Sequence, residues 1–186
     1  RGRRELYAVR SKRVWPGLDD KTLTSWNGLM LRAFAEAGVA LDRDDYVDVA
    51  RRNADFILTH LRRDGLLLRT YKNGESKLNG YLEDYAYTIE GLVSLYEATF
   101  EMRWLREAKS LAETMIAEFW DDAEGGFLFT GTAHEERIRR TKELEDNATP
   151  SGNSVAAWGL LRLSAVVGNL DYRDRAETVL EAVKAL

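Results

Sequence analysis

The chain carries three copies of one pattern of paired helices, and this repetition constrains the fold more than any other feature. Each copy joins a helix rich in Ala, Gly and Leu to a more charged helix. The second helix begins with an aromatic residue four positions before an alanine, in the pairs Tyr46 with Ala50, Trp104 with Ala108 and Tyr172 with Ala176. These anchors lie 58 and 68 residues apart, which fits a helical hairpin with an inserted loop.

Hydrophobic periodicity gives the expected ranges of the six helices, because apolar residues recur at three- and four-residue intervals in each. The ranges are 22–41, 44–61, 82–99, 103–119, 151–167 and 172 to the end. They predict one domain over 1–186, with hairpins at about 22–63, 82–119 and 150–186. Between the first two hairpins, Asn73-Gly74 favours the positive φ angles of a tight β-hairpin turn. The segment 125–129 resembles a second short strand.

The residue types of the two helices in each pair indicate how the hairpins are arranged. Small residues let the first helix approach neighbours on several sides, whereas the charged second helix suits an outer surface. We therefore predict an all-α fold of the α/α toroid type, with about three hairpins present and short β-hairpin insertions. An α-solenoid is the alternative. The long polar loops before each first helix favour the toroid, because they can converge over its centre.

Composition narrows the classes of partner. Hydrophobic residues make up 45% and charged residues 31% of the chain, and the formal net charge is −4 with both signs interleaved. We expect no nucleic-acid partner, because no broad basic face is visible. The first thirteen residues are the exception, with six basic residues against Glu5, and we expect a solvated tail there. No apolar run approaches the roughly 20 residues of a membrane span.

Metal and redox chemistry have little support in the sequence. The chain has no cysteine, so it can form neither a disulfide nor a thiolate metal site. His60 and His134 follow no metal-ligand spacing, and neither is expected near the starts of the first helices. We predict no metal and no cofactor. The compartment stays open, with a weak preference for the cytoplasm.

Polar residues gather in the segments 18–28, 78–87 and 144–154, where each first helix begins. If these helices run parallel around an axis, the three segments meet on one face, where helix N-termini favour negative charge. Their contents suit a sugar or another polyhydroxylated small molecule. Asp84 and Asp146 are the candidate catalytic acid and base. The candidate substrate-binding residues are Trp26 and Tyr85 as stacking surfaces and Asn27, Glu83, Asn147, Ser151 and Asn153 as hydroxyl-binding groups.

The same residues also have structural explanations. Thr24, Ser25 or Asp146 would serve as helix N-caps, Trp26 as a core residue, and Asp84 as a buried carboxylate that ties two hairpins together. A non-catalytic helical scaffold, or protein-interaction module, is therefore the second hypothesis.

Three stretches carry a family resemblance: LDDKTLTSWNGLM, LEDYAYTIEGLVSLYEAT and DNATPSGNSVAAWGLLRL. From about Val9 to the last helix, the chain resembles the helical part of the thioredoxin-domain-containing proteins of the spermatogenesis-associated protein 20 and YyaL type. The resemblance implies an α/α toroid similar to six-hairpin glycosidases and N-acylglucosamine 2-epimerases. If the chain is an enzyme, it implies glycosidase-like or sugar-isomerase-like chemistry. The thioredoxin-like part is not found in this sequence, and the histidines expected of a sugar 2-epimerase are not found where the first helices of the hairpins begin.

The half-toroid also predicts how the chain associates. The flanks of its first and last hairpins would be apolar and uncovered, and such surfaces usually bind a partner. The chain begins with Arg1 and stops at Leu186 inside a helical pattern, which suggests a fragment. We expect either a homo-oligomer or missing domains of a longer chain to cover these flanks.

Overall fold

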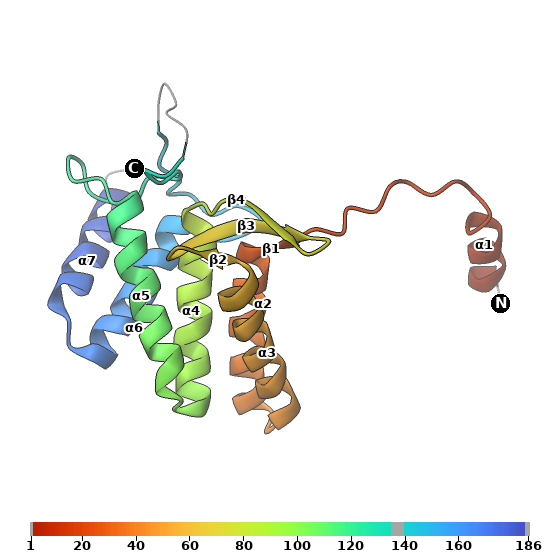
Figure 1. Cartoon of the computed structure of the whole chain (residues 1–186), viewed down its shortest axis with the longest axis horizontal. Coiled ribbons are helices and arrows are strands. Elements are labelled where there is room, and N and C mark those ends of the chain that lie inside the picture. The colour runs from red at the N-terminus through yellow and green to blue at the C-terminus, as the bar shows by residue number, and fades with distance from the viewer. Residues whose placement is uncertain (1, 135–139, 185–186) are drawn as a thin grey trace.

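The computed structural model describes residues 2–134 and 140–184 and is mainly helical (Figure 1). Apart from α1, the helices closely follow the ranges that periodicity predicts. Their bounds are α1 Gly2–Arg10, α2 Thr24–Ala40, α3 Asp44–His60, α4 Leu82–Thr99, α5 Met102–Phe119, α6 Gly152–Val167 and α7 Leu170–Lys184.

Six of these helices form two layers. The inner helices α2, α4 and α6 lie side by side, and α3, α5 and α7 each pack mainly against the inner helix that precedes them (Figure 1). The middle helix α4 has neighbours on three sides and is buried at every position from Asp84 to Leu95. The predicted division into small-residue inner helices and charged outer helices is confirmed.

Glycines allow the inner helices to approach closely. A Cβ atom on Gly28 of α2 would lie 2.7 Å from the main-chain carbonyl carbon of Tyr87 on α4. A Cβ on Gly91 of α4 would lie 2.8 Å from Cγ of Leu31. Real Cβ atoms do not approach other carbon atoms so closely, so the α2–α4 contact depends on glycine at both positions.

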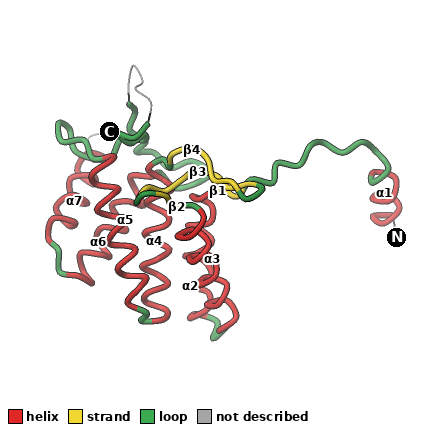
Figure 2. The backbone as a smooth tube through the Cα atoms, in the orientation of Figure 1, coloured by secondary structure: helices red, strands yellow, loops and turns green. Residues whose placement is uncertain are grey.

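A small antiparallel sheet lies across the N-terminal ends of α2 and α4 (Figure 2). Its strands are β1 Thr22–Leu23, β2 Arg62–Arg63, β3 Leu66–Lys72 and β4 Glu75–Asn79, and β3 pairs with each of the others. The β3–β4 turn is formed by Asn73 and Gly74 with φ angles of 51° and 83°, as the sequence predicts. The sheet thus brings β3 to the starts of two inner helices.

Two local predictions are corrected. The segment 125–129 is not a strand, because only an isolated bridge between Phe127 and Trp120 forms there. The basic residues at the N-terminus are solvent-exposed, as expected of a solvated tail or linker, but Gly2–Arg10 form the helix α1, which the sequence did not predict. No residue of α1 is buried, and an extended segment separates this helix from the hairpins (Figure 1).

None of the helices within the described ranges combines the length and the hydropathy that a membrane span requires.

Candidate functional site

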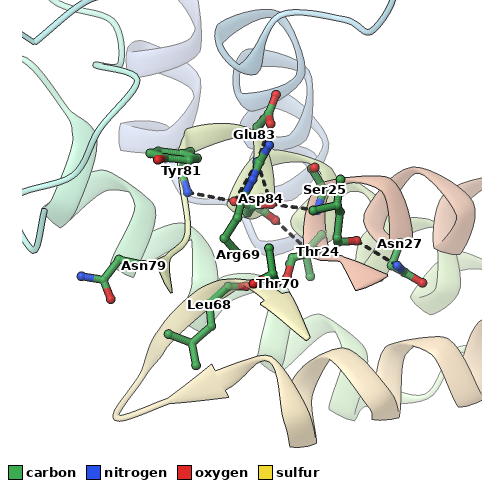
Figure 3. Close-up of polar contacts among 12 residues, drawn as sticks. Thr24, Ser25, Asn27, Leu68, Arg69, Thr70, Asn79, Tyr81, Glu83 and Asp84 are labelled. Carbon is green, nitrogen blue, oxygen red and sulfur yellow. Dashed lines mark hydrogen bonds and ion pairs between the residues drawn. The ribbon is translucent and has the colours of Figure 1, made fainter. Parts of the chain in front are cut away.

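The carboxylate of Asp84 joins the starts of two inner helices. Its Oδ1 accepts a hydrogen bond from the main-chain N–H of Ser25 at 2.8 Å, and its Oδ2 accepts one from the main-chain N–H of Tyr81 at 2.9 Å (Figure 3). Ser25 lies in the first turn of α2 and Tyr81 is the N-cap residue of α4. Asp84 itself is completely buried. It therefore occupies the position of a buried carboxylate that ties two hairpins together.

Arg69 on β3 completes this polar cluster. Its Nη1 lies 3.2 Å from Oδ1 and 3.1 Å from Oδ2 of Asp84, and it also forms an ion pair with Glu83 (Figure 3). The guanidinium carbon lies 5.1 Å from the centre of the Tyr81 ring. Arg69 is not among the candidates that the sequence suggests, because it belongs to the β-hairpin insertion and lies outside the three polar segments. It is the charge that compensates the buried carboxylate.

Glu83 and Asp84 are adjacent in sequence but differ in solvent exposure. The Glu83 side chain is 20% exposed and Asp84 is 0% exposed. Burial raises the pKa of Asp84 to about 6, although the charge of Arg69 and the N–H of Tyr81 both act to lower that pKa. Asp84 can therefore titrate near neutral pH without contact to a ligand, whereas Glu83 is the carboxylate of this pair that a ligand can reach.

At the start of α6, a second carboxylate lies on the surface. Oδ1 of Asp146 accepts hydrogen bonds from the main-chain N–H of Ser151 at 2.8 Å and from the hydroxyl of Ser154 at 3.1 Å. Ser151 is the N-cap of α6, and its buried hydroxyl accepts from the N–H of Ser154 at 3.0 Å. Asp146 and Asn147 are both exposed. The capping role is thus taken by Ser151, and Asp146 keeps access to solvent.

Two predicted ligand-binding residues have structural positions instead. Asn153 is buried: its Oδ1 accepts from the N–H of Phe127 at 2.8 Å, and its Nδ2 donates to the carbonyls of Phe127 and Glu143 at 2.9 and 3.0 Å. Tyr85 is buried against Phe119, and its hydroxyl oxygen accepts from the N–H of Leu67 at 2.8 Å. Burial also raises the pKa of Tyr85 to about 12. Neither side chain offers a free surface to a ligand.

At the start of α2, Trp26 is 61% exposed and is therefore not a core residue. Asn27 is half-buried, and its Nδ2 donates to the carbonyl of Leu23 at 2.8 Å. The expectation that Thr24 or Ser25 caps the helix is corrected, since the N-cap is Leu23 and has no side-chain hydrogen bond. The capping oxygen comes instead from Asp84.

The starts of all three inner helices meet. Asp84 links the first start to the second through Ser25. The hydroxyl of Tyr87 on α4 donates to the carbonyl of Pro150, which links the second start to the third. Burial raises the pKa of Tyr87, and the charges of Glu83 and Asp146 raise it further. Side chains from α4 and from the segment before α6 therefore act on one hydroxyl.

His134 lies closer to this region than the sequence indicates. Its ring stacks on Tyr81 with 5.1 Å between ring centres, and its Nδ1 accepts from the N–H of Gly131 at 3.1 Å. His134 thus supports the N-cap residue of α4, which corrects the expectation that it lies away from the helix starts. In the part of the chain that the structure describes, no group of three His, Cys, Asp or Glu residues could hold a metal ion.

No protein-family model matches the chain. In sequence, it is 36% identical over 192 residues to spermatogenesis-associated protein 20 of Homo sapiens and 38% identical over 192 residues to that of Mus musculus. Each match covers 97% of this chain and 24% of the relative. The chain therefore spans about a quarter of the length of these curated relatives.

Solved structures with the same fold are about twice as long. Cellobiose 2-epimerase from Bacillus thermoamylovorans aligns with a TM-score of 0.73 and 14% identity, over 87% of this chain and 44% of that one. A GH76 alpha-mannanase from Bacteroides thetaiotaomicron aligns with a TM-score of 0.73 and 13% identity, over 94% of this chain and 46% of the mannanase. An unsaturated glucuronyl hydrolase specific for heparin aligns with a TM-score of 0.71 and 20% identity, over 98% of this chain and 53% of the hydrolase. This likeness confirms the predicted fold, about half of an α/α toroid.

Proposed function

Because this chain is homologous to one quarter of spermatogenesis-associated protein 20 and folds as about half of an α/α toroid, we propose that it forms one side of a carbohydrate-binding site. The site lies where α2, α4 and α6 begin. The observation that carries the proposal is the meeting of these three helix starts through Asp84 and through the Tyr87–Pro150 hydrogen bond. The toroids that align with the chain include an epimerase, a mannanase and a glucuronyl hydrolase, and these also support a carbohydrate ligand.

The accessible side chains at these helix starts have the chemistry that a sugar requires. Trp26 offers a flat apolar face, on which the C–H groups of a sugar ring can pack. Glu83 and Asp146 offer carboxylate acceptors, and Asn147 offers both a donor and an acceptor for hydroxyl groups. A ligand that combines apolar ring faces with many hydroxyls satisfies all four side chains.

The carboxylates in the proposal differ from the pair that the sequence suggests. Asp84 and Asp146 are the sequence-based candidates for acid and base, but both oxygens of Asp84 are buried and hydrogen-bonded. We assign the contact with ligand to Glu83 and Asp146, and we assign to Asp84 the role of positioning Arg69 and the two helix starts. If the site is catalytic, Glu83 and Asp146 are the residues that would exchange protons with substrate.

Isothermal titration calorimetry against a panel of mono- and oligosaccharides tests the proposal. We expect at least one sugar to bind, and we expect Trp26→Ala and Glu83→Gln each to weaken that binding at least tenfold. Trp15→Ala is the matched control, because Trp15 is 52% exposed but its ring lies beside Arg10 of α1. Equal binding by Trp26→Ala and Trp15→Ala would remove Trp26 from the site.

A specific observation favours the second candidate function, a non-catalytic scaffold. Asp84, Tyr85, Ser151 and Asn153 are buried, and each makes internal hydrogen bonds. A helical scaffold whose buried polar residues are used in internal hydrogen bonds would bind no sugar. The absence of heat with every member of the panel would therefore support the scaffold and contradict the carbohydrate site.

A further inference from the structure

A second polar cluster lies midway along the inner helices, and residues of all three helices contribute to it. Glu90 of α4 forms an ion pair with Arg162 of α6, and its Oε1 lies 3.9 Å from Nη1 of Arg32 on α2. The Glu90 side chain is only 2% exposed. A buried carboxylate between two arginines therefore connects all three inner helices.

One oxygen of this carboxylate has no hydrogen-bond partner among the described residues. Oε1 of Glu90 accepts a hydrogen bond from Arg162, whereas Oε2 is buried and has no partner at hydrogen-bond geometry. Burial raises the pKa of Glu90, whereas the charge of Arg162 and a weaker polar contact from the Trp158 side chain act to lower that pKa. An unsatisfied buried acceptor is destabilising, so native structures rarely keep one without a reason. A ligand that donates a hydrogen bond to Oε2 would supply that reason.

An exposed aromatic side chain lies beside this acceptor. Trp158 is 50% exposed although it is part of an inner helix. It is four residues before Arg162, so the two side chains share one face of α6, and Arg162 contacts Glu90 on that face. Trp158 and Oε2 of Glu90 are thus an apolar surface next to a hydrogen-bond acceptor.

This cluster continues the proposed site along the inner wall. Glu83 and Glu90 are seven residues apart on α4, which is about two helical turns, so their side chains lie on the same face of the helix. Both also form ion pairs with arginines that come from other elements, Arg69 for Glu83 and Arg162 for Glu90. The two carboxylates therefore lie in line along α4. Because α4 itself is buried from Asp84 to Leu95, the accessible side chain beside Glu90 is the half-exposed Trp158 of α6.

We propose that Trp158 and Oε2 of Glu90 form a second contact site for the same carbohydrate, and that this site selects a neutral sugar ring. The inference rests on the proposed function and extends it to a class of substrate. The ring packs on the exposed face of Trp158, and one ring hydroxyl donates to Oε2 after a small rotation of the indole. Charge favours a neutral ring, because two arginines, Arg32 and Arg162, contact three carboxylates, those of Glu36, Glu90 and Glu97. The excess negative charge repels a uronate.

Calorimetric titration of the full chain with cellobiose, and separately with a glucuronic-acid-containing disaccharide, tests the inference. We expect the wild-type chain to bind cellobiose at least tenfold more tightly than the uronate. Trp158→Ala and Glu90→Gln should each weaken the binding of cellobiose at least fivefold. Trp15→Ala is again the matched control, because its exposed fraction of 52% is close to the 50% of Trp158.

The outcomes separate this inference from the proposed function. Suppose that cellobiose binds and that Trp26→Ala weakens this binding, whereas Trp158→Ala and Glu90→Gln do not. The second contact site at Trp158 and Glu90 is then wrong, and the site at the helix starts is supported. Tighter binding of the uronate would overturn the assignment to a neutral sugar. If neither disaccharide binds the wild-type chain, the second contact site at Trp158 and Glu90 is wrong. The larger panel of mono- and oligosaccharides then tests the proposed function separately. Thermal unfolding shows whether Glu90→Gln folds. If Glu90→Gln does not fold, Trp158→Ala alone tests the second contact site, because Trp158 is half exposed and its removal should leave the chain folded.

Discussion

Oδ1 of Asp84 lies 2.8 Å from the main-chain nitrogen of Ser25, a residue 59 positions earlier and on a different helix. The other oxygen binds the main-chain nitrogen of Tyr81, at the start of the helix that contains Asp84. One carboxylate therefore satisfies free N–H groups of two helices, which usually requires a separate cap for each. Because Arg69 neutralises the charge from a third element, removal of Asp84 would disturb α2, α4 and β3 together.

Asp84→Ala should lower the free energy of unfolding by about 3–5 kcal/mol, because it leaves Arg69 without its buried partner and two helix starts without a cap. Urea denaturation followed by circular dichroism measures the change. Asp146→Ala is the matched control: this carboxylate also accepts a main-chain hydrogen bond at a helix start but is exposed, so we expect a loss of about 1 kcal/mol. Similar losses for the two variants would contradict the central role of Asp84.

The raised pKa of Asp84 predicts a pH dependence of stability. A pKa of about 6 in the folded chain, against 3.8 as the ordinary value, means that the folded state binds the proton more tightly than the unfolded state. The contribution of Asp84 is therefore fully present below pH 4 and is lost as pH rises through 6, by up to about 3 kcal/mol. The free energy of unfolding of wild type relative to Asp84→Asn should fall between pH 4 and 7. Glu90 also has a raised pKa but is present in both proteins, so the difference isolates Asp84. A constant difference would show that the pKa of Asp84 is not raised.

Arg69→Met should move this transition to higher pH. The guanidinium favours the charged form of Asp84, so its loss raises the pKa of the carboxyl further. Met keeps much of the apolar stem of the side chain and removes the charge. The same pH series measures the midpoint, with Lys77→Met as the control, because Lys77 forms an exposed ion pair with Glu75 on β4. A midpoint that stays in place would mean that Arg69 does not set the protonation of Asp84.

The helices were predictable from the sequence because their signal is local. Small and apolar residues recur with a period of about 3.6 along each inner helix, and the threefold repeat aligns the three helix starts. The Asn73-Gly74 turn is equally local, since two residues determine its φ angles. The segment 125–129 misled the prediction, because Asn153 binds Phe127 through its side chain and replaces a pairing strand.

The candidate site was predictable in place but not in detail. Glu83 and Asp84 are adjacent, and nothing local indicates which of them faces the interior. That choice depends on Arg69 and Ser25, which reach Asp84 from β3 and α2. The burial of Tyr85 likewise depends on Phe119, on another helix. Long-range contacts of this kind leave no periodic signal in a single sequence.

Gly28→Ala tests the close contact of the inner helices. The added methyl carbon would lie 2.7 Å from the carbonyl carbon of Tyr87, which is main chain and cannot rotate away. Because the helices must move apart, we expect a loss of about 1–3 kcal/mol in the free energy of unfolding. Gly159→Ala is the control on α6, since its Cβ would meet Cγ2 of Ile89 at an ordinary contact distance of 3.5 Å. Urea denaturation of both variants compares the two sites, and equal stability would contradict the tight α2–α4 contact.

Asn153→Ala should loosen the loop that covers the start of α6 without unfolding the hairpins. The amide of Asn153 makes three hydrogen bonds to main-chain atoms of Phe127 and Glu143, and alanine leaves those buried groups unsatisfied at a cost of about 1–3 kcal/mol. Hydrogen exchange at the Phe127 amide should then accelerate about tenfold or more, because this N–H loses its acceptor. The amide of Ile89 on α4 should keep its protection, because the hydrogen bonds of the Asn153 side chain go to Phe127 and Glu143. Faster exchange at both amides would show that Asn153 supports the whole inner layer, and unchanged exchange at Phe127 would show that the loop is held by other contacts.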